Sequence, residues 1–192
     1  HEPVEQMASL RCIPGMTVIR PADPTETGAA WIAALKNKTG PTAILLTRQN
    51  LAVIDRSKHP AASSLEKGAY TLWQSGAGDP TLLLLASGSE VELALLAGRE
   101  LAKDFNVRVV SMPSWELFEK QPEAYRLSVL PPACPRRLAI EAACSFGWAK
   151  YVGASGRTIC LDRFGASAPY KTLAEKFGFT AANVVSVVRQ MA

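Results

Sequence analysis

The sequence predicts an α/β fold in which helices cover a parallel sheet. The prediction rests on Thr81–Met112, which reads strand, helix, strand. Its first part, Thr81–Ala86, is an apolar run without polar alternation, which is typical of a strand buried on both faces. Val107–Met112 is again strand-like. A strand, a crossover helix and a second strand of this length form a βαβ unit, and such units are almost always right-handed.

The helix between these strands carries its own start and stop signals. Ser89 and Glu92 have the spacing of a capping box, in which each side chain binds the other residue's backbone N–H. Asn106 can adopt the left-handed conformation that ends a helix. The turn Ala86–Ser89 could instead bind an anion at the helix N-terminus. Its spacing matches neither glycine-rich phosphate fingerprint, and Glu90 and Glu92 would repel a phosphate, so we favour capping alone.

The residues before this unit predict a second, smaller α/β unit. We expect a short helix at Glu2–Arg11, a strand at Met16–Arg20, a helix capped by Asp23 with Pro24 in its first turn, and a buried strand at Thr42–Thr47. Two parallel strands cannot cover both faces of their sheet. Either they join the sheet around Thr81–Met112, or further strands precede His1. We favour the second option, since a chain that begins with His1 is expected to be a fragment.

The rest of the chain continues the α/β pattern. A polar stretch from Asp55 to Lys67 indicates a connector between the two units. Gly178 can end a helix in the left-handed conformation. The further strands are expected at Ala69–Gln74, Arg137–Ala142 and Thr158–Asp162, and the further helices at Cys144–Val152, Pro169–Phe177 and Thr180–Met191.

Composition argues against several classes of function. Of the 192 residues, 48% are hydrophobic and 20% are charged, which is typical of a soluble globular protein. The net charge is +4, but the basic residues are scattered, so we expect no nucleic-acid partner. No apolar run approaches the roughly 18 residues that span a membrane. Four cysteines without a C-x-x-C pair or a preceding signal peptide indicate reduced thiols in a cytosolic protein and argue against zinc.

Three residues are candidates for chemistry. Arg48 follows the strand Thr42–Thr47, and ligands of open α/β sheets bind beyond the carboxyl ends of strands, where an arginine can hold a phosphate bidentately. The alternative for a lone arginine is a surface ion pair. His1 could donate or accept a proton near a substrate. Glu141, on a strand that looks buried, could be a general base with a raised pKa, but an ion-paired glutamate is the commoner case.

Several longer strings are far more specific than these single residues. HEPVEQMASLRCIPGMTVIRPAD, GPTAILLTRQNL, ASGSEVELAL, FEKQPEAYRLSVLP, GWAKYVG, DRFGASAP and KFGFTAANVV follow one another in the order and spacing of transketolases. Related deoxyxylulose phosphate synthases and pyruvate dehydrogenase β chains share the architecture but not these strings. The chain therefore resembles, over essentially its whole length, the C-terminal portion of a transketolase.

The resemblance implies both an organisation and an activity. Residues 1–55 would be the end of the pyrimidine-binding domain, 56–67 a linker, and 68–192 the C-terminal domain with a mostly parallel five-stranded sheet and flanking helices. The whole enzyme would transfer a two-carbon ketol unit between sugar phosphates in the pentose phosphate pathway, using thiamine diphosphate and magnesium. It would be a cytoplasmic homodimer with active sites between its subunits.

The resemblance also implies roles for two residues. His1 falls on the histidine of the H-[EQ]-P motif, which lies beside the reactive end of the cofactor and the substrate. Arg48 falls on the arginine of the T-R-Q-N motif, which binds the terminal phosphate of the substrate. The residues that bind thiamine diphosphate and the metal would precede His1. The chain alone is therefore expected neither to bind the cofactor tightly nor to catalyse transfer, and to contribute packing and dimer contacts.

An interpretation from another class is a free-standing α/β module that binds a nucleotide or another small regulator at the turn Ser87–Ser89. A gene that extends several hundred codons upstream of His1 would favour the first interpretation. A start codon directly before His1 would favour the second.

Overall fold

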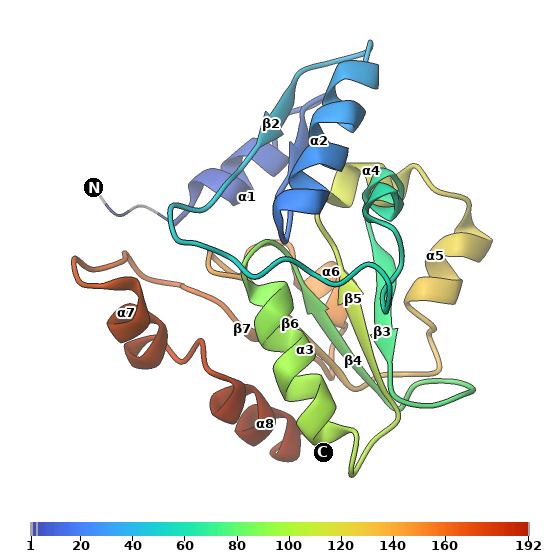
Figure 1. The fold of residues 1–192 in the computed structure, drawn as a ribbon, viewed down its shortest axis with the longest axis vertical. Helices are drawn as coiled ribbons and strands as arrows, with labels where there is room; N and C mark the ends of the chain where they lie inside the picture. The colour runs from blue at the N-terminus through green and yellow to red at the C-terminus, as the bar shows by residue number, and fades with distance from the viewer. Residues whose placement is uncertain (1, 3, 192) are drawn as a thin grey trace.

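The core of the protein is a five-stranded sheet, with a two-stranded sheet beside it (Figure 1). The structure is a computed structural model that describes residue 2 and residues 4–191. The larger sheet has the order β3-β5-β4-β6-β7, in which β3 is antiparallel to β5 and the other neighbours are parallel. Its strands are β3 (Tyr70–Gln74), β4 (Leu82–Ala86), β5 (Val107–Ser111), β6 (Arg137–Ile140) and β7 (Arg157–Ile159). The predicted mostly parallel five-stranded sheet is confirmed.

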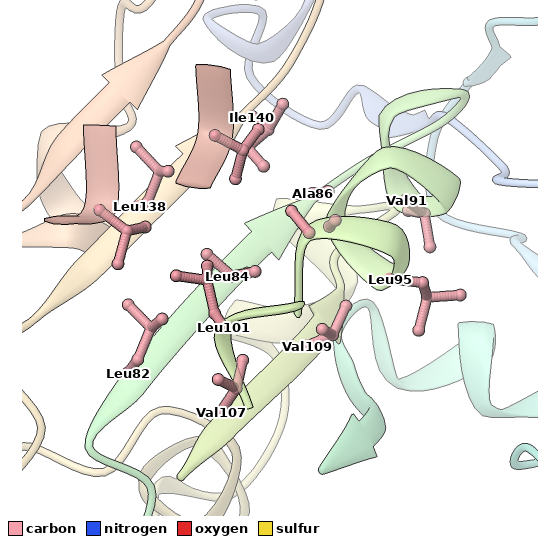
Figure 2. Close-up of a cluster of buried hydrophobic side chains, with 14 of the residues drawn as sticks. Leu82, Leu84, Ala86, Val91, Leu95, Leu101, Val107, Val109, Leu138 and Ile140 are labelled. Carbon is pink, nitrogen blue, oxygen red and sulfur yellow. The ribbon is translucent and has the colours of Figure 1, made fainter. Parts of the chain in front are cut away.

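The apolar sequence of β4 follows from its central place in this sheet. All five of its residues are fully buried. Leu82 and Leu84 face the cluster that includes α3 (Glu90–Leu101), as Figure 2 shows, whereas Leu83 and Leu85 face a second cluster on the other side. A strand with a hydrophobic layer on each face needs an apolar residue at every position.

Helices cover both faces of the larger sheet. On one face α3 packs against α8 (Ala181–Arg189), and on the other lie α4 (Trp115–Glu119), α5 (Glu123–Val129) and α6 (Ala149–Val152). The remaining helix of this region, α7 (Tyr170–Lys176), buries none of its residues and ends before Gly178, which has the predicted left-handed conformation. The layers are therefore helix, sheet, helix.

The first part of the chain forms the smaller unit. Its elements are α1 (Gln6–Arg11), β1 (Thr17–Ile19), α2 (Pro24–Lys36) and β2 (Thr42–Ile44), and β1 and β2 pair in parallel. Among the described residues these two strands do not join the larger sheet, so the first option is not realised there, and further strands before His1 stay a prediction. The carboxylate of Asp23 accepts a hydrogen bond from the backbone N–H of Glu26 at 2.8 Å, which confirms the predicted N-cap. The prediction that β2 is buried is wrong: it is half-buried, because no strand of the described chain covers its outer edge.

Two predicted helix signals of α3 are wrong, because other hydrogen bonds engage both side chains. The hydroxyl of Ser89 makes no capping bond but donates to Glu90 at 2.6 Å. Asn106 is not left-handed; its amide instead donates to the carbonyls of Ala77 and Asp79 and holds the turn before β4. The predicted helix at Cys144–Val152 is shortened to α6, because Gly147 has a φ of 94°, which an α-helix cannot include.

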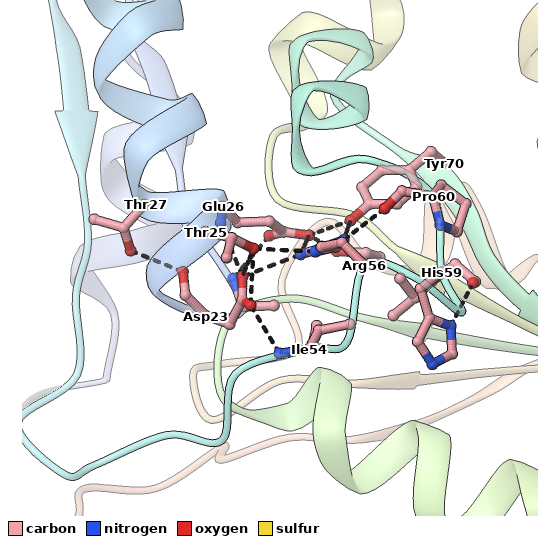
Figure 3. Close-up of polar contacts among 12 residues, drawn as sticks. Asp23, Thr25, Glu26, Thr27, Ile54, Arg56, His59, Pro60 and Tyr70 are labelled. Atoms are coloured by element: carbon pink, nitrogen blue, oxygen red, sulfur yellow. Dashed lines mark hydrogen bonds and ion pairs between the residues drawn. The ribbon is translucent and has the colours of Figure 1, made fainter.

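The connector between the two units is packed rather than free. It contains a short 3-10 helix, η1 (Ala62–Lys67), with Leu65 fully buried. Arg56 bridges both sides: it pairs with Asp23 of the first unit at 3.0 Å and donates to the hydroxyl of Tyr70 in β3 at 3.0 Å (Figure 3). Glu26 of α2 accepts hydrogen bonds from the Tyr70 and Ser111 hydroxyls. Side-chain contacts thus hold the two units together across the connector.

We expect Gly28→Ala to stabilise the protein by about 0.5–1 kcal/mol, because Gly28 is exposed within α2 and an added Cβ would meet nothing within 4 Å. Gly98→Ala in α3 is the matched control. There a Cβ would lie 2.9 Å from Cγ2 of buried Val109, so the free energy of unfolding should fall by about 1–3 kcal/mol. Urea denaturation measures both changes. Equal stability of the two variants would contradict the close packing of α3 on β5.

Candidate functional site

Arg48 lies in the loop that follows β2, and its side chain is exposed. Because β2 ends at Ile44, Arg48 is not directly at the end of a strand, as the sequence predicted, but four residues beyond it. Among the described residues, no hydrogen bond or ion pair involves its guanidinium, so the surface ion pair considered as an alternative is not formed there. An exposed guanidinium without a competing carboxylate keeps all its donors available to an anion.

A cavity of about 430 Å³ lies beside this loop. Thr47, Gln49 and Asn50, the neighbours of Arg48, line one part of it. Glu2 and Val4 line another part. His1 lies outside the described residues, so the structure does not place its side chain; the residues that follow it in sequence border the same cavity as the neighbours of Arg48. Glu2 and the neighbours of Arg48 thus border one cavity.

A buried ion pair that sequence reasoning missed, Arg20 with Glu90, also lines this cavity. Arg20 follows β1, and its Nη1 bonds to the carboxylate of Glu90 and donates to the carbonyl of Ser87 at 2.7 Å. Arg20 fills the turn between β4 and α3, where a Cβ on Gly88 would lie 2.6 Å from its Cζ. A cation of the chain itself therefore occupies the turn at which the second interpretation placed a nucleotide. One feature of the sequence indicates a cation at this turn: the acidic residues Glu90 and Glu92 in the first turn of the helix attract positive charge.

Glu141 is a second buried acid next to this pair. It is fully buried, and both of its oxygens accept hydrogen bonds from Arg11 at 2.9 Å. Ser87 and Trp148 donate to it as well, at 2.5 Å and 2.8 Å. Burial alone would raise the pKa of Glu141, but the positive charge of Arg11 and these hydrogen bonds outweigh burial and hold the pKa below its ordinary value. Glu141 is thus the ion-paired glutamate that we considered the commoner case, and not a general base.

The described residues do not fit the diphosphate and metal of thiamine diphosphate. Within residues 2 and 4–191, no group of three or more His, Cys, Asp or Glu side chains is placed to hold a metal ion. The two buried acids nearest the cavity, Glu90 and Glu141, are already neutralised by arginines.

The same part of the chain contains no helix long and apolar enough to cross a membrane.

We expect Glu141→Gln to lower the free energy of unfolding by about 3–5 kcal/mol near neutral pH, because the buried guanidinium of Arg11 loses its counter-charge. The folded-state pKa of Glu141 lies below its unfolded value, so this stabilisation is present above the unfolded pKa and is lost as the pH falls through the folded pKa.

The difference between wild type and variant should therefore shrink on going from about pH 7 to about pH 3, as measured by urea denaturation at each pH. Glu66→Gln is the control: its pair with Lys36 is exposed, so the change should be within about 1 kcal/mol. A difference independent of pH would show that Glu141 is not charged in the folded protein.

Comparisons with known proteins cover the whole chain. The family model described as the transketolase pyrimidine-binding domain matches residues 1–53, and that of the transketolase-like C-terminal domain matches residues 68–180. The transketolase of Bacillus subtilis is 52% identical over 192 residues, which are 100% of this chain and 29% of the relative. A transketolase structure from Leishmania mexicana is 42% identical with a TM-score of 0.91, covering 100% of this chain and 27% of that chain. A transketolase from Pichia stipitis in complex with sedoheptulose-7-phosphate is 36% identical with a TM-score of 0.90, and the shares covered are again 100% and 27%.

The chain thus spans about 29% of the length of the curated relatives that it matches. The agreement in sequence extends over both sheets, and the agreement in fold includes the mostly parallel order of the larger one. The resemblance inferred from the sequence strings is confirmed. This chain belongs to the transketolase family.

Proposed function

We propose that the chain is the C-terminal portion of an enzyme that transfers a two-carbon ketol unit between sugar phosphates in the pentose phosphate pathway. The observation that carries this proposal is that residues of both family motifs, Glu2 of H-E-P at the start of the chain and the neighbours of Arg48 in T-R-Q-N, border one cavity. The Pichia stipitis relative in complex with a sugar phosphate supports the class of substrate. Residues 1–55 would belong to the pyrimidine-binding domain, 56–67 to a linker and 68–192 to the C-terminal domain.

Arg48 would bind the terminal phosphate of the substrate. Its guanidinium is exposed and has no partner among the described residues, so phosphate need not displace an internal ion pair. A planar guanidinium can form two parallel, charge-assisted hydrogen bonds to a phosphate. His1, by its place in the H-E-P motif, would act next to the reacting carbon, as both a catalytic and a substrate-binding residue.

The rest of the enzyme would lie outside this chain. We propose thiamine diphosphate and magnesium as its cofactors, held by other residues, since those described here do not fit them. We also propose a cytoplasmic homodimer. An apolar face of α2 supports this state, because Trp31 and Leu35 are 57% and 71% exposed and would gain from burial against another subunit.

In the full-length enzyme, we expect Arg48→Ala to raise KM for phosphorylated sugars about 10- to 100-fold with little change in kcat, since a charge-assisted contact to the phosphate is lost. KM for an unphosphorylated acceptor should change little. Arg99→Ala, which removes another exposed arginine, is the control and should alter neither constant. Steady-state kinetics with both acceptors measure the effect. An equal rise for both acceptors would contradict phosphate binding by Arg48.

The chain of 192 residues alone should show no micromolar binding of thiamine diphosphate, because its described residues offer no fitting donor set. Calorimetric titration in the presence of magnesium tests this, with the full-length enzyme as the positive control. Saturable micromolar binding by the chain alone would refute the proposed location of the cofactor site.

A further inference from the structure

The larger sheet has its topological switch point between β4 and β6. From β4 the chain crosses through α3 to β5 on one side, and it returns through α4 and α5 to β6 on the other side. Ligands of open α/β sheets bind outside the carboxyl ends of the strands at such a point. Ser87 directly follows β4 and Glu141 directly follows β6, so these two residues mark the place where a ligand would be expected.

Two arginines of the first unit occupy this place. Arg20 hydrogen-bonds to the Ser87 hydroxyl at 3.2 Å and pairs with Glu90, and Arg11 pairs with Glu141. The Ser87 hydroxyl in turn donates to Glu141, so all five side chains form one network. The side chains of Arg11 and Arg20 are only 5% and 8% exposed, and those of their acidic partners 0% and 8%.

Loops at the same edge of the sheet also bind the backbone next to His1. The N–H of Gly165, in the loop after β7, donates to the carbonyl of Glu2 at 3.0 Å. The N–H of Cys144, in the loop after β6, donates to the carbonyl of Val4 at 3.3 Å. Glu2 has a φ of 61°, and no other non-glycine residue of the described chain has a positive φ. A non-glycine residue in this conformation is strained and persists where its surroundings fix it.

We infer that the ligand-binding edge of the larger sheet binds residue 2 and residues 4–20 of the chain in place of a separate ligand. In this arrangement Arg11, Glu141 and Gly165 are positioning residues: they fix the backbone that is covalently joined to His1. The functional part of the inference rests on the proposed role of His1. A misplacement of about 1 Å in a reacting group costs on the order of 100-fold in rate, so a loss of these contacts should appear in kcat.

The most selective test is Gly165→Ala in the full-length enzyme. A Cβ at Gly165 would lie 3.2 Å from the Cβ of Glu2, too close for ordinary contact, and would push on the residue next to His1. Gly165 is not left-handed, so alanine suits its own backbone. We expect kcat for ketol transfer to fall about tenfold or more, with KM for the sugar phosphate within about twofold and Tm unchanged. Gly76→Ala, in the turn between β3 and β4, is the matched control: its Cβ would lie 3.2 Å from the Asn106 side chain, an equally close contact away from His1, and it should leave kcat unchanged.

A second test compares two ion pairs that join the same two units. Arg11→Gln removes the pair with Glu141, and Arg56→Gln removes the pair with Asp23, which lies in the junction shown in Figure 3. Both variants should lower Tm. Only Arg11→Gln should also lower kcat and speed amide hydrogen exchange in residues 2–11. Arg11→Lys, which retains the positive charge, should recover part of kcat.

Two outcomes would overturn the inference. One is equal loss of kcat in Arg11→Gln and Arg56→Gln, which would make the network merely stabilising. The other is unchanged kcat in Gly165→Ala, and this variant decides alone if Arg11→Gln fails to fold. An inactive wild-type enzyme would refute the proposed function instead; hydrogen exchange in residues 2–11 would still show whether Arg11 and Gly165 hold this segment.

Discussion

The position of the first unit depends on the buried carboxylate of Glu141. A fully buried charge is very costly unless it is paired and its oxygens accept hydrogen bonds. Here the donors come from three separate parts of the chain: Arg11 in α1, Ser87 after β4 and Trp148 before α6. If any of these elements moved away, a buried charge would lose a partner. The requirement to satisfy one carboxylate therefore couples the start of the chain to the switch point of the larger sheet.

Two of the buried acids at the junction, Glu141 and Glu26, differ because their arginines lie at different distances. Arg11 forms two hydrogen bonds of 2.9 Å with Glu141, and the pKa of Glu141 lies below its ordinary value. Arg56 is 3.9 Å from Glu26, where burial dominates and raises the pKa despite hydrogen bonds from Tyr70 and other donors. By linkage, the ionised carboxylate of Glu141 stabilises the folded state. Ionisation of Glu26 instead destabilises it, so Glu26 contributes more to stability when it is protonated. The junction thus contains two contacts whose pH dependences oppose each other.

The sequence predicts the elements whose signals are local and misses the contacts that are not. β4 could be predicted because burial on both faces leaves an uninterrupted apolar run. Asp23 and Ser89 carry similar capping signals, yet only Asp23 caps its helix, because Glu90 and Arg20 engage the Ser89 hydroxyl. Arg20 and Glu90 are 70 positions apart, and Arg11 and Glu141 are 130 apart. Periodicity and motif spacing in short stretches of sequence do not indicate pairs so far apart. The network at the switch point could therefore be found only from the structure.

The switch point of the larger sheet also shows what a rule about folds can and cannot predict. The rule that ligands bind at the carboxyl ends of strands correctly locates a binding edge on the larger sheet, but it does not say what binds there. The occupants are two guanidiniums of the same chain, and their charges are matched by Glu90 and Glu141. Because that edge is filled, the phosphate of the proposed substrate would have to bind elsewhere. The loop after β2 offers what the filled edge lacks: an exposed guanidinium, that of Arg48, beside an open cavity.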